Sequence, residues 1–321
     1  MPWSTKRLLF IMGKGGTGKT TVAAAMGLTA RNAGRRVLVV ELGSASRLSG
    51  LFRVDSLGDT PTPLSDHLDA VCLNPKMVLK DYIQTHLPFS IMARRINRAE
   101  WVDVIAESTP GLQEAMTLGK IWHLSEEIDK KGAYRYDLIL VDTPATCDGI
   151  RLLQQPETFI NRVRVGPFAD QLKEVQELVS DSEKTGLVLV SLPEELPVNE
   201  TLKLTRAAQT ALRIPVDATV INGCYSRKFS SEEVKELRAF KDRVAAGSIR
   251  KVLKTALAQD HRYRFQHFFV NHLRKRSLGK IIELPCLFSN DLGIGELQTL
   301  AKHIVDRSPS IDNGTSEFKM V

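Results

Sequence analysis

The sequence predicts an α/β protein with a largely parallel, doubly wound sheet and helices on both faces. Three observations predict this fold. Short apolar runs typical of buried strands alternate along the chain with longer helical patterns. A glycine-rich loop joins the first strand to the first helix, and a second strand follows that helix closely. Such a βαβ unit has parallel strands and a right-handed crossover.

The first strand is expected over residues 8–12. The loop that follows it, residues 13–20, matches G-x-x-x-x-G-K-S/T, the pattern of a phosphate-binding loop. Residues 20–33 continue it as an Ala-rich helical pattern that ends before Gly34. Glycines let the backbone approach phosphate oxygens, and the helix adds the positive end of its dipole. The alternative, a chance glycine-rich turn, is disfavoured by the full match in this context. We expect these residues to bind nucleotide: Gly13, Lys14, Gly15, Gly16, Thr17, Gly18, Lys19, Thr20 and Thr21.

A strand over residues 136–143 ends in Asp142 and matches the pattern of a Walker B strand. In such a site Lys19 reaches the β- and γ-phosphates, while the Thr20 hydroxyl and the Asp142 carboxylate hold Mg²⁺. Asp142 as the cap of the following helix is the alternative interpretation. The turn over residues 142–146 is where a nucleotide-dependent switch would lie.

Between the second strand, residues 36–42, and the strand ending in Asp142, the sequence changes character. We expect loop with short helical pieces over residues 43–76, and a helical subdomain inserted at about residues 77–130. Met77, Met92 and Met116 fall in this insertion, and methionines suit an adaptable apolar groove. Plain packing of the insertion is the alternative for each of these residues.

The remaining segments continue the alternation within one ATPase-sized domain, residues 1–321. We expect helices over 168–182, 199–212 and 295–305, strands over 185–192, 216–222 and 281–285, a capping box at Ser230, and a flexible tail over 307–321. Residues 250–276 contain eight Lys or Arg and one acid, Asp260. They are interpreted either as a basic amphipathic helix facing a membrane or acidic partner, or as an ordinary packed surface helix.

Composition excludes several classes of protein. Hydrophobic content of 43% and charged content of 25% over 321 residues suit a globular protein. The net charge of +7 favours anionic ligands without selecting nucleic acid. Four separated cysteines without a C-x-x-C pair indicate neither a disulfide framework nor a zinc knuckle. With no signal-peptide pattern and no apolar run of about 20 residues, we expect a cytoplasmic protein with peripheral membrane contact at most.

Several segments together resemble the ArsA family of ATPases, which includes the arsenite-pump ATPase and the ATPase that escorts tail-anchored membrane proteins. Lys14 gives the loop the "deviant" Walker A form of this class. Residues 142–156 resemble the family's switch II, residues 109–116 its PGIDEAM segment, and residues 192–201 its A-loop. The likeness covers about residues 7–305 and is strongest to the bacterial Get-like branch, whose members often occur as paired paralogues.

The resemblance implies a SIMIBI-type P-loop NTPase that uses ATP, ADP and Mg²⁺. It implies that Lys14 reaches across a dimer interface to the partner's nucleotide, and a solvated lysine at the loop tip is the alternative. Asn222 matches the family's adenine-contacting asparagine, and Pro285 matches its C-terminal "P-L" element. The partner would be a second copy or an ArsA-like paralogue, and the helical subdomain would bind an apolar client.

One segment departs from the family. Its switch I reads S-T-D-P-A-H-N, and the Asp polarises the attacking water. Here the aligned residues are 41–47, and the position of the Asp falls on Gly43. Glu41 lies two residues earlier, and we interpret it as a substitute base acting through water or as an outer partner of Mg²⁺. The cysteine trio that would bind arsenite is also absent, which disfavours metalloid transport.

Three functions therefore remain open at this stage. The leading one is a nucleotide-switch ATPase in which Mg-ATP closes a dimer and reshapes the helical subdomain. The second is a regulatory or scaffold half of a heterodimer that hydrolyses ATP poorly because of Gly43. The third is a ParA- or MinD-like positioning ATPase on DNA or membrane. Turnover separates the first two, and nucleotide-dependent binding to DNA or liposomes tests the third.

Overall fold

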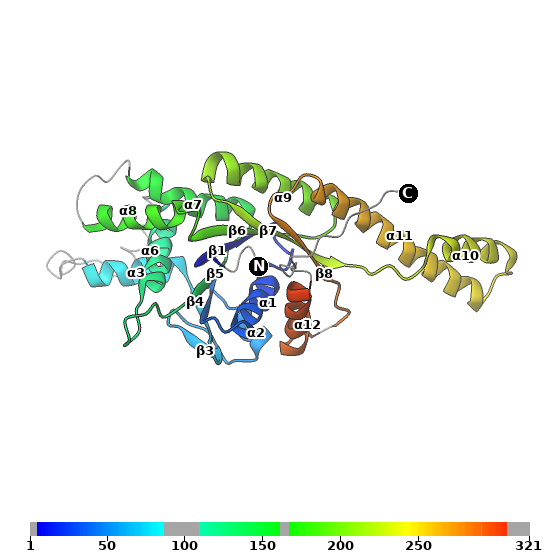
Figure 1. Cartoon of the computed structure of the whole chain (residues 1–321), viewed down its shortest axis with the longest axis horizontal. Helices are drawn as coiled ribbons and strands as arrows, with labels where there is room; N and C mark the ends of the chain where they lie inside the picture. The colour runs from blue at the N-terminus through cyan, green and yellow to red at the C-terminus, as the bar shows by residue number, and fades with distance from the viewer. Residues whose placement is uncertain (1–4, 87–108, 161–166, 290, 307–321) are drawn as a thin grey trace, which may run out of the picture.

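The computed structural model describes residues 5–86, 109–160, 167–289 and 291–306 (Figure 1). It contains an eight-stranded sheet of order β3-β4-β2-β5-β1-β6-β7-β8. Every neighbouring pair is parallel except β3 and β4. The strands are β1 (Leu8–Met12), β2 (Val37–Leu42), β3 (Thr62–Ser65), β4 (Leu68–Leu73), β5 (Leu138–Asp142), β6 (Thr185–Ser191), β7 (Val216–Cys224) and β8 (Lys280–Pro285). The predicted α/β class with a mostly parallel sheet is confirmed.

Helices cover both faces of the sheet, as the alternating pattern predicts. They are α1 (Lys19–Asn32), α2 (Leu48–Phe52), α3 (Pro75–His86), α6 (Leu112–Glu126), α7 (Thr146–Ile160), α8 (Pro167–Ser180), α9 (Glu195–Ala207), α10 (Ser231–Arg243), α11 (Ser248–Arg274) and α12 (Ile294–Asp306), with a π-helical turn η2 (Ala208–Leu212) after α9. Figure 1 shows α1, α2 and α12 below the sheet and α7 and α9 above it.

The central strands are buried on both sides because each face has its own hydrophobic core. Leu9 and Ile11 of β1 face the core shared with α1 and α12, whereas Leu8, Phe10 and Met12 face the core shared with α6 to α9. All five residues of β1 and all seven of β6 are buried. Near-continuous apolar strands of this kind are typical of a parallel sheet covered on both faces.

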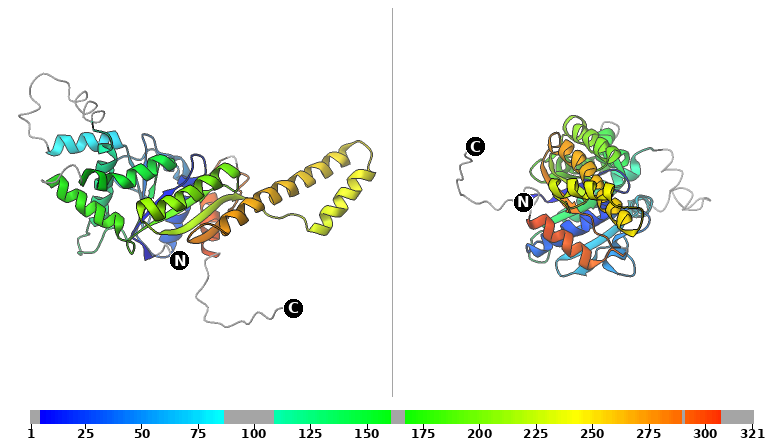
Figure 2. Two further views of the ribbon diagram at one scale, coloured as in Figure 1. Left: turned by 90° about the horizontal axis from the view of Figure 1, so that it is seen from above. Right: turned by 90° about the vertical axis from the view of Figure 1, so that its right-hand side faces the viewer.

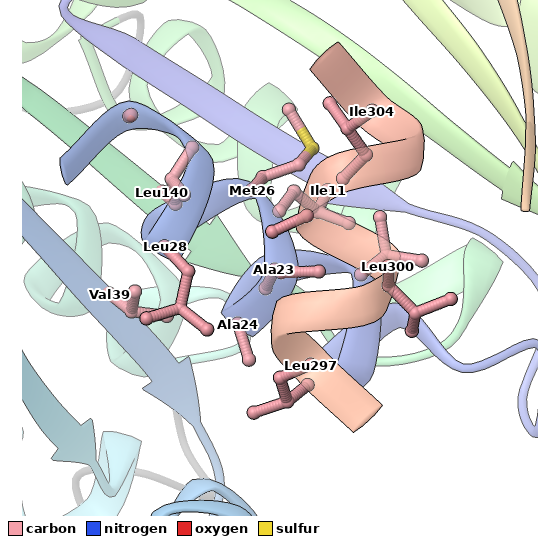
Figure 3. Packing of buried hydrophobic residues seen from close by; sticks show 14 of the residues in the cluster. Ile11, Ala23, Ala24, Met26, Leu28, Val39, Leu140, Leu297, Leu300 and Ile304 are labelled. Carbon is pink, nitrogen blue, oxygen red and sulfur yellow. The ribbon is translucent and has the colours of Figure 1, made fainter. Parts of the chain in front are cut away.

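Close packing fixes α1 beside the sheet, and with it the loop that precedes the helix. Small residues of α1, Ala23 and Ala24, face Leu297 and Leu300 of α12 (Figure 3). On the other side, a Cβ added at Gly27 would lie 3.1 Å from Val39 of β2. The Ala-rich sequence of α1 therefore serves close packing between the sheet and α12.

The segment between β4 and β5 contains two helices in the part that the structure describes, and its role as an inserted subdomain stays a prediction. It contributes α3 and α6, which gather with α7 and α8 at one end of the molecule. Met116 is 4% exposed and belongs to the packed interior, whereas Met77 is 45% exposed. Met92 lies outside the described residues, as does the predicted tail over 307–321.

At the opposite end, α10 and α11 form a helical hairpin that projects from the body (Figure 2). The capping box is confirmed, because the Ser230 hydroxyl accepts from the Glu233 N–H while Glu233 accepts from the Ser230 N–H. The C-terminal part of α11 packs on the body through Val270 and Leu273. Phe265 and Phe268, however, are 53% and 65% exposed, so the apolar residues of this helix do not form one buried face.

One sequence expectation is wrong. Residues 43–76 were expected to be loop with short helical pieces, and α2 fits this, but β3 and β4 also lie here. Leu68, Ala70, Val71 and Leu73 are fully buried and pair β4 with β2. Asp69 and the short, half-buried β3 obscure this strand signal. No described helix is both long and apolar enough to cross a membrane.

Candidate functional site

The predicted phosphate-binding loop lies between β1 and α1 with the geometry that its glycines permit. Gly16 and Gly18 have φ of 84° and 87°, a region that side chains strongly disfavour. A Cβ at Gly13 would lie 2.2 Å from the Val190 carbonyl oxygen, so only glycine fits this position. The Thr17 hydroxyl donates to the Lys14 carbonyl oxygen at 2.9 Å, which fixes the turn of the loop.

A cleft of about 940 Å³ opens at the carboxyl ends of the central strands, where open parallel sheets bind ligands. Four segments line it: the phosphate-binding loop, residues 41–47 with the start of α2, residues 142–145, and residues 291–292. From the loop and the start of α1, the lining residues are Gly15, Gly16, Gly18, Lys19, Thr20 and Thr21. The cleft therefore joins the predicted phosphate loop to both predicted switch segments.

Lys19, Thr20 and Asp142 meet in this cleft. The Thr20 hydroxyl donates to Asp142 Oδ2 at 2.5 Å, while Asp142 Oδ1 is buried without a hydrogen-bond partner among the described residues. Burial raises the pKa of Asp142 to about 6, against the opposing effects of Thr20 and Lys19. Burial also lowers the pKa of Lys19, partly offset by Asp142. A hydroxyl beside a carboxylate with a free oxygen is a donor set that suits Mg²⁺.

Glu41 is the penultimate residue of β2 and is 4% exposed. Its Oε2 accepts from the Ser46 hydroxyl at 2.6 Å and from the Leu48 N–H at 3.2 Å, and its Oε1 accepts from the Arg47 N–H at 2.9 Å. The carboxylate thereby satisfies backbone donors at the start of α2. Glu41 lines the cleft, but its oxygens are already occupied in holding the loop that follows it.

Gly43 lies between these anchors and also lines the cleft. Its N–H donates to the Leu73 carbonyl oxygen at 3.0 Å, which joins the loop to the end of β4. A Cβ built at Gly43 would meet only the Ala45 carbonyl oxygen, at an ordinary 3.7 Å. The backbone of the loop therefore leaves room for a side chain where the sequence has none.

Arg47 is a cleft residue that the sequence interpretation did not single out. Its side chain is exposed, and its positive charge adds to the lowering of the pKa of Lys19 and opposes the rise in the pKa of Asp142. The available signal was an arginine four positions after Gly43, in the segment aligned with switch I.

The other predicted site residues lie beside the cleft and outside its lining. The Asn222 amide, at the end of β7, donates to the Thr17 carbonyl oxygen at 3.0 Å and thus braces the loop from the other side. Pro285 ends the neighbouring strand β8. Lys14 is half-exposed, and no described carboxylate forms an ion pair with it. The adenine contacts and the role across an interface remain predictions.

Comparison with known proteins agrees with this arrangement. The model of the anion-transporting ATPase family matches residues 6–166 and 164–252. ATPase BagA of Mycobacterium tuberculosis is 30% identical over 256 residues, which cover 78% of this chain and 74% of BagA. ATPase ASNA1 homolog 1 of Paramecium tetraurelia is 25% identical over 256 residues, covering 68% of this chain and 75% of that protein. With the family model matched over well more than half of its length, the chain belongs to the anion-transporting ATPase family, the ArsA-type P-loop ATPases.

Proposed function

We propose that the chain binds ATP, ADP and Mg²⁺ in the 940 Å³ cleft and works as a nucleotide-dependent switch. The observation that carries this proposal is the meeting of Lys19, Thr20 and Asp142 beside a glycine loop of the required conformation. Lys19 contacts the β- and γ-phosphates. Thr20 and Asp142 hold Mg²⁺, which neutralises phosphate charge when it is bound. Asn222 and Pro285 border the base.

In this proposal ATP binding closes a dimer, and closure reshapes the helices at the end formed by α3, α6, α7 and α8. Lys14 is suited to act across the interface because its half-exposed side chain has no described ion-pair partner. A cavity of about 410 Å³ lies between α3 and α6, where Val78, Tyr82 and Met116 share the lining with Asp59, Asp81, Lys120, His123 and Gln171. We place the client at this end of the molecule, where it would meet polar as well as apolar side chains. The partner is a second copy or a paralogue of the same family.

Sedimentation with and without Mg-ATP tests this switch. We expect wild-type chain, alone or with its paralogue, to form an ATP-dependent dimer. Lys14→Ala should weaken that dimer while leaving ATP affinity of the monomer nearly intact, whereas Lys203→Ala on α9 serves as an exposed control. If Lys14→Ala lowers ATP affinity of the monomer as much as it lowers dimer formation, Lys14 acts only on the nucleotide bound by its own chain. No disulfide joins Cys72, Cys224 and Cys286, the cysteines whose side chains the structure describes, which suits a reducing cytoplasm, where we place this activity.

A second candidate function is a hydrolysis-poor regulatory half of a heterodimer. The observation in its favour is the switch I loop, where Gly43 offers no side chain and the Glu41 carboxylate accepts hydrogen bonds from the start of α2. Steady-state turnover by the purified chain, alone and with a paralogue from the same genome, separates the two functions. Turnover that appears only in the mixture favours the regulatory half.

A further inference from the structure

We propose that Arg47 binds the terminal phosphate of ATP and makes this cleft select ATP over ADP. This inference rests on the proposed function, because it assigns the recognition of the γ-phosphate within the same nucleotide site. It concerns a residue that stands where the family pattern has an uncharged side chain. The argument depends on where Arg47 lies, how it is held, and what the neighbouring residues cannot do.

Arg47 shares one cleft with the phosphate-contacting residues. Lys19 and Thr20 line this cleft from α1, and Arg47 lines it from the start of α2. The charge of Arg47 also acts on Lys19 and on Asp142, which places it in the electrostatic surroundings of the predicted phosphate site. ATP differs from ADP in the γ-phosphate, which the proposed function places between Lys19 and the loop of residues 41–47. A charge on this loop therefore acts on the part of the nucleotide that distinguishes ATP from ADP.

The backbone of Arg47 is held while its side chain remains available. Its N–H donates to both carboxylate oxygens of Glu41, at 2.9 and 3.0 Å. Among the described residues no carboxylate forms an ion pair with the guanidinium, and the other arginine near this edge, Arg53, pairs with Asp291 at 3.1 Å. Glu41 therefore positions Arg47 through the main chain and leaves the charged group free to meet a ligand.

No other side chain of this loop can recognise a phosphate by charge. Gly43 and Ala45 carry no polar group, and the Ser46 hydroxyl donates to Glu41 at 2.6 Å. Ser44 offers a single neutral hydroxyl. The planar guanidinium of arginine donates parallel hydrogen bonds to phosphate oxygens, and such charged bonds are stronger than neutral ones. With the Asp of switch I missing, charge from Arg47 is the contact that this loop supplies to the γ-phosphate.

The test compares ATP with ADP. Calorimetry on the full-length chain with Mg²⁺ should give affinities for ADP and for a non-hydrolysable ATP analogue with an imido bridge between the β- and γ-phosphates. Arg47→Ala should weaken the binding of the ATP analogue by about ten-fold or more, which is the effect of losing a charged hydrogen bond. It should change the affinity for ADP by less than about three-fold. Arg47→Lys keeps the charge without the fork and should fall between the two. Arg238→Ala on α10, an exposed arginine far along the chain, is the matched control.

The outcomes separate this inference from the function on which it rests. Wild-type chain that binds both nucleotides, with an unchanged ratio of affinities in Arg47→Ala, overturns the role of Arg47 and leaves the nucleotide site standing. An equal loss for both nucleotides also overturns it, because Arg47 then acts on the shared phosphates or on the fold. Wild-type chain that binds neither nucleotide overturns the proposed function and Arg47 with it.

Discussion

Two loops line the cleft, the phosphate-binding loop of residues 13–20 and the loop of residues 41–47. They differ in how fully they keep the sequence patterns that they resemble. Residues 13–20 keep every position of the phosphate-binding pattern, and Val190 and Asn222 constrain them from outside the loop. Residues 41–47 keep their anchors, through Glu41 and Leu73, but have Gly43 where the switch I pattern that they resemble has an Asp. If the proposed function holds, this difference predicts that nucleotide binding and hydrolysis depend on separate loops, so that this chain keeps the first without the second.

The largest effect is expected from restoring the missing side chain. Gly43→Asp should raise ATP turnover, since a positioned general base typically contributes about 10²–10⁴-fold. The structure permits this variant, because a Cβ at Gly43 meets only the Ala45 carbonyl oxygen at 3.7 Å. Steady-state phosphate release measures it, and Gly43→Asn, similar in shape but unable to accept a proton, is the control. Equal rates in both variants would contradict the assignment of the base to this position.

The second-largest effect is expected in the phosphate-binding loop, which keeps every position of its pattern. Lys19→Ala removes a half-buried charge that, in the proposed function, contacts the β- and γ-phosphates, so ATP affinity should fall by about 1.5–3 kcal/mol, the range for a charged hydrogen bond. Calorimetry with Mg-ATP measures this loss, and Lys203→Ala on α9 is the control for removing a lysine. If Lys19→Ala binds ATP as tightly as wild type, the phosphate loop has been assigned wrongly.

The role of Glu41 determines whether residues 41–47 supply a general base in place of the Asp that is missing at Gly43. The structure favours an anchoring role, because the carboxylate accepts from the Ser46 hydroxyl and from the N–H groups of Arg47 and Leu48. Glu41→Ala should therefore cost about 1–2 kcal/mol of unfolding free energy, the value of a lost helix cap with its partners. Glu41→Gln keeps the shape of the side chain and one acceptor oxygen, and it should keep most of the wild-type turnover. Loss of turnover in Glu41→Gln with unchanged stability would show that Glu41 has taken over the base.

A largely buried acid away from both loops, Asp217, gives the smallest effect on nucleotide binding and turnover and serves as a reference for stability. Burial raises the pKa of Asp217 to about 6, although Lys6 lies 3.8 Å away and opposes the shift. The folded state then holds this proton more tightly than the unfolded state, so stability falls as pH rises between about 4 and 6 and stays lower above. Asp217→Asn should remove that fall and add about 1–3 kcal/mol at pH 7. Thermal unfolding across this pH range measures it, with exposed Asp55→Asn as control, and parallel wild-type and Asp217→Asn curves would contradict it.

The sequence predicted most of the fold because the strongest signals were local. Continuous apolar runs such as β1 and β6 gave the parallel sheet, and the capping box at Ser230 located the start of α10. Residues 68–73 were misassigned because β4 is stabilised by non-local pairing with β2, and a single Asp69 breaks its apolar pattern. Strand pairing between segments about 30 residues apart leaves little trace in a short window.

The candidate site shows the same contrast between features that the sequence predicted and features that depend on three-dimensional contacts. The loop at Gly13 was located by its motif between a strand and a helix, and Asp142 by the apolar strand that it ends, and the structure brings Thr20 and Asp142 into contact. Arg47 and the anchoring contacts of Glu41 were not found, because they depend on how residues 41–48 turn back on the end of β2. A motif reports which residues are present, but the partners that a carboxylate has acquired emerge only in three dimensions.

The most direct test of whether this chain binds ATP without hydrolysing it efficiently is a single-turnover experiment. Excess wild-type chain is mixed with Mg-ATP labelled in the γ-phosphate, and protein-bound ATP and released phosphate are followed in the same samples. The account predicts that most of the ATP becomes bound and that phosphate appears well below about 1 s⁻¹, the low end of ordinary enzymes. Phosphate release as fast as binding, or ATP that stays unbound, would contradict it.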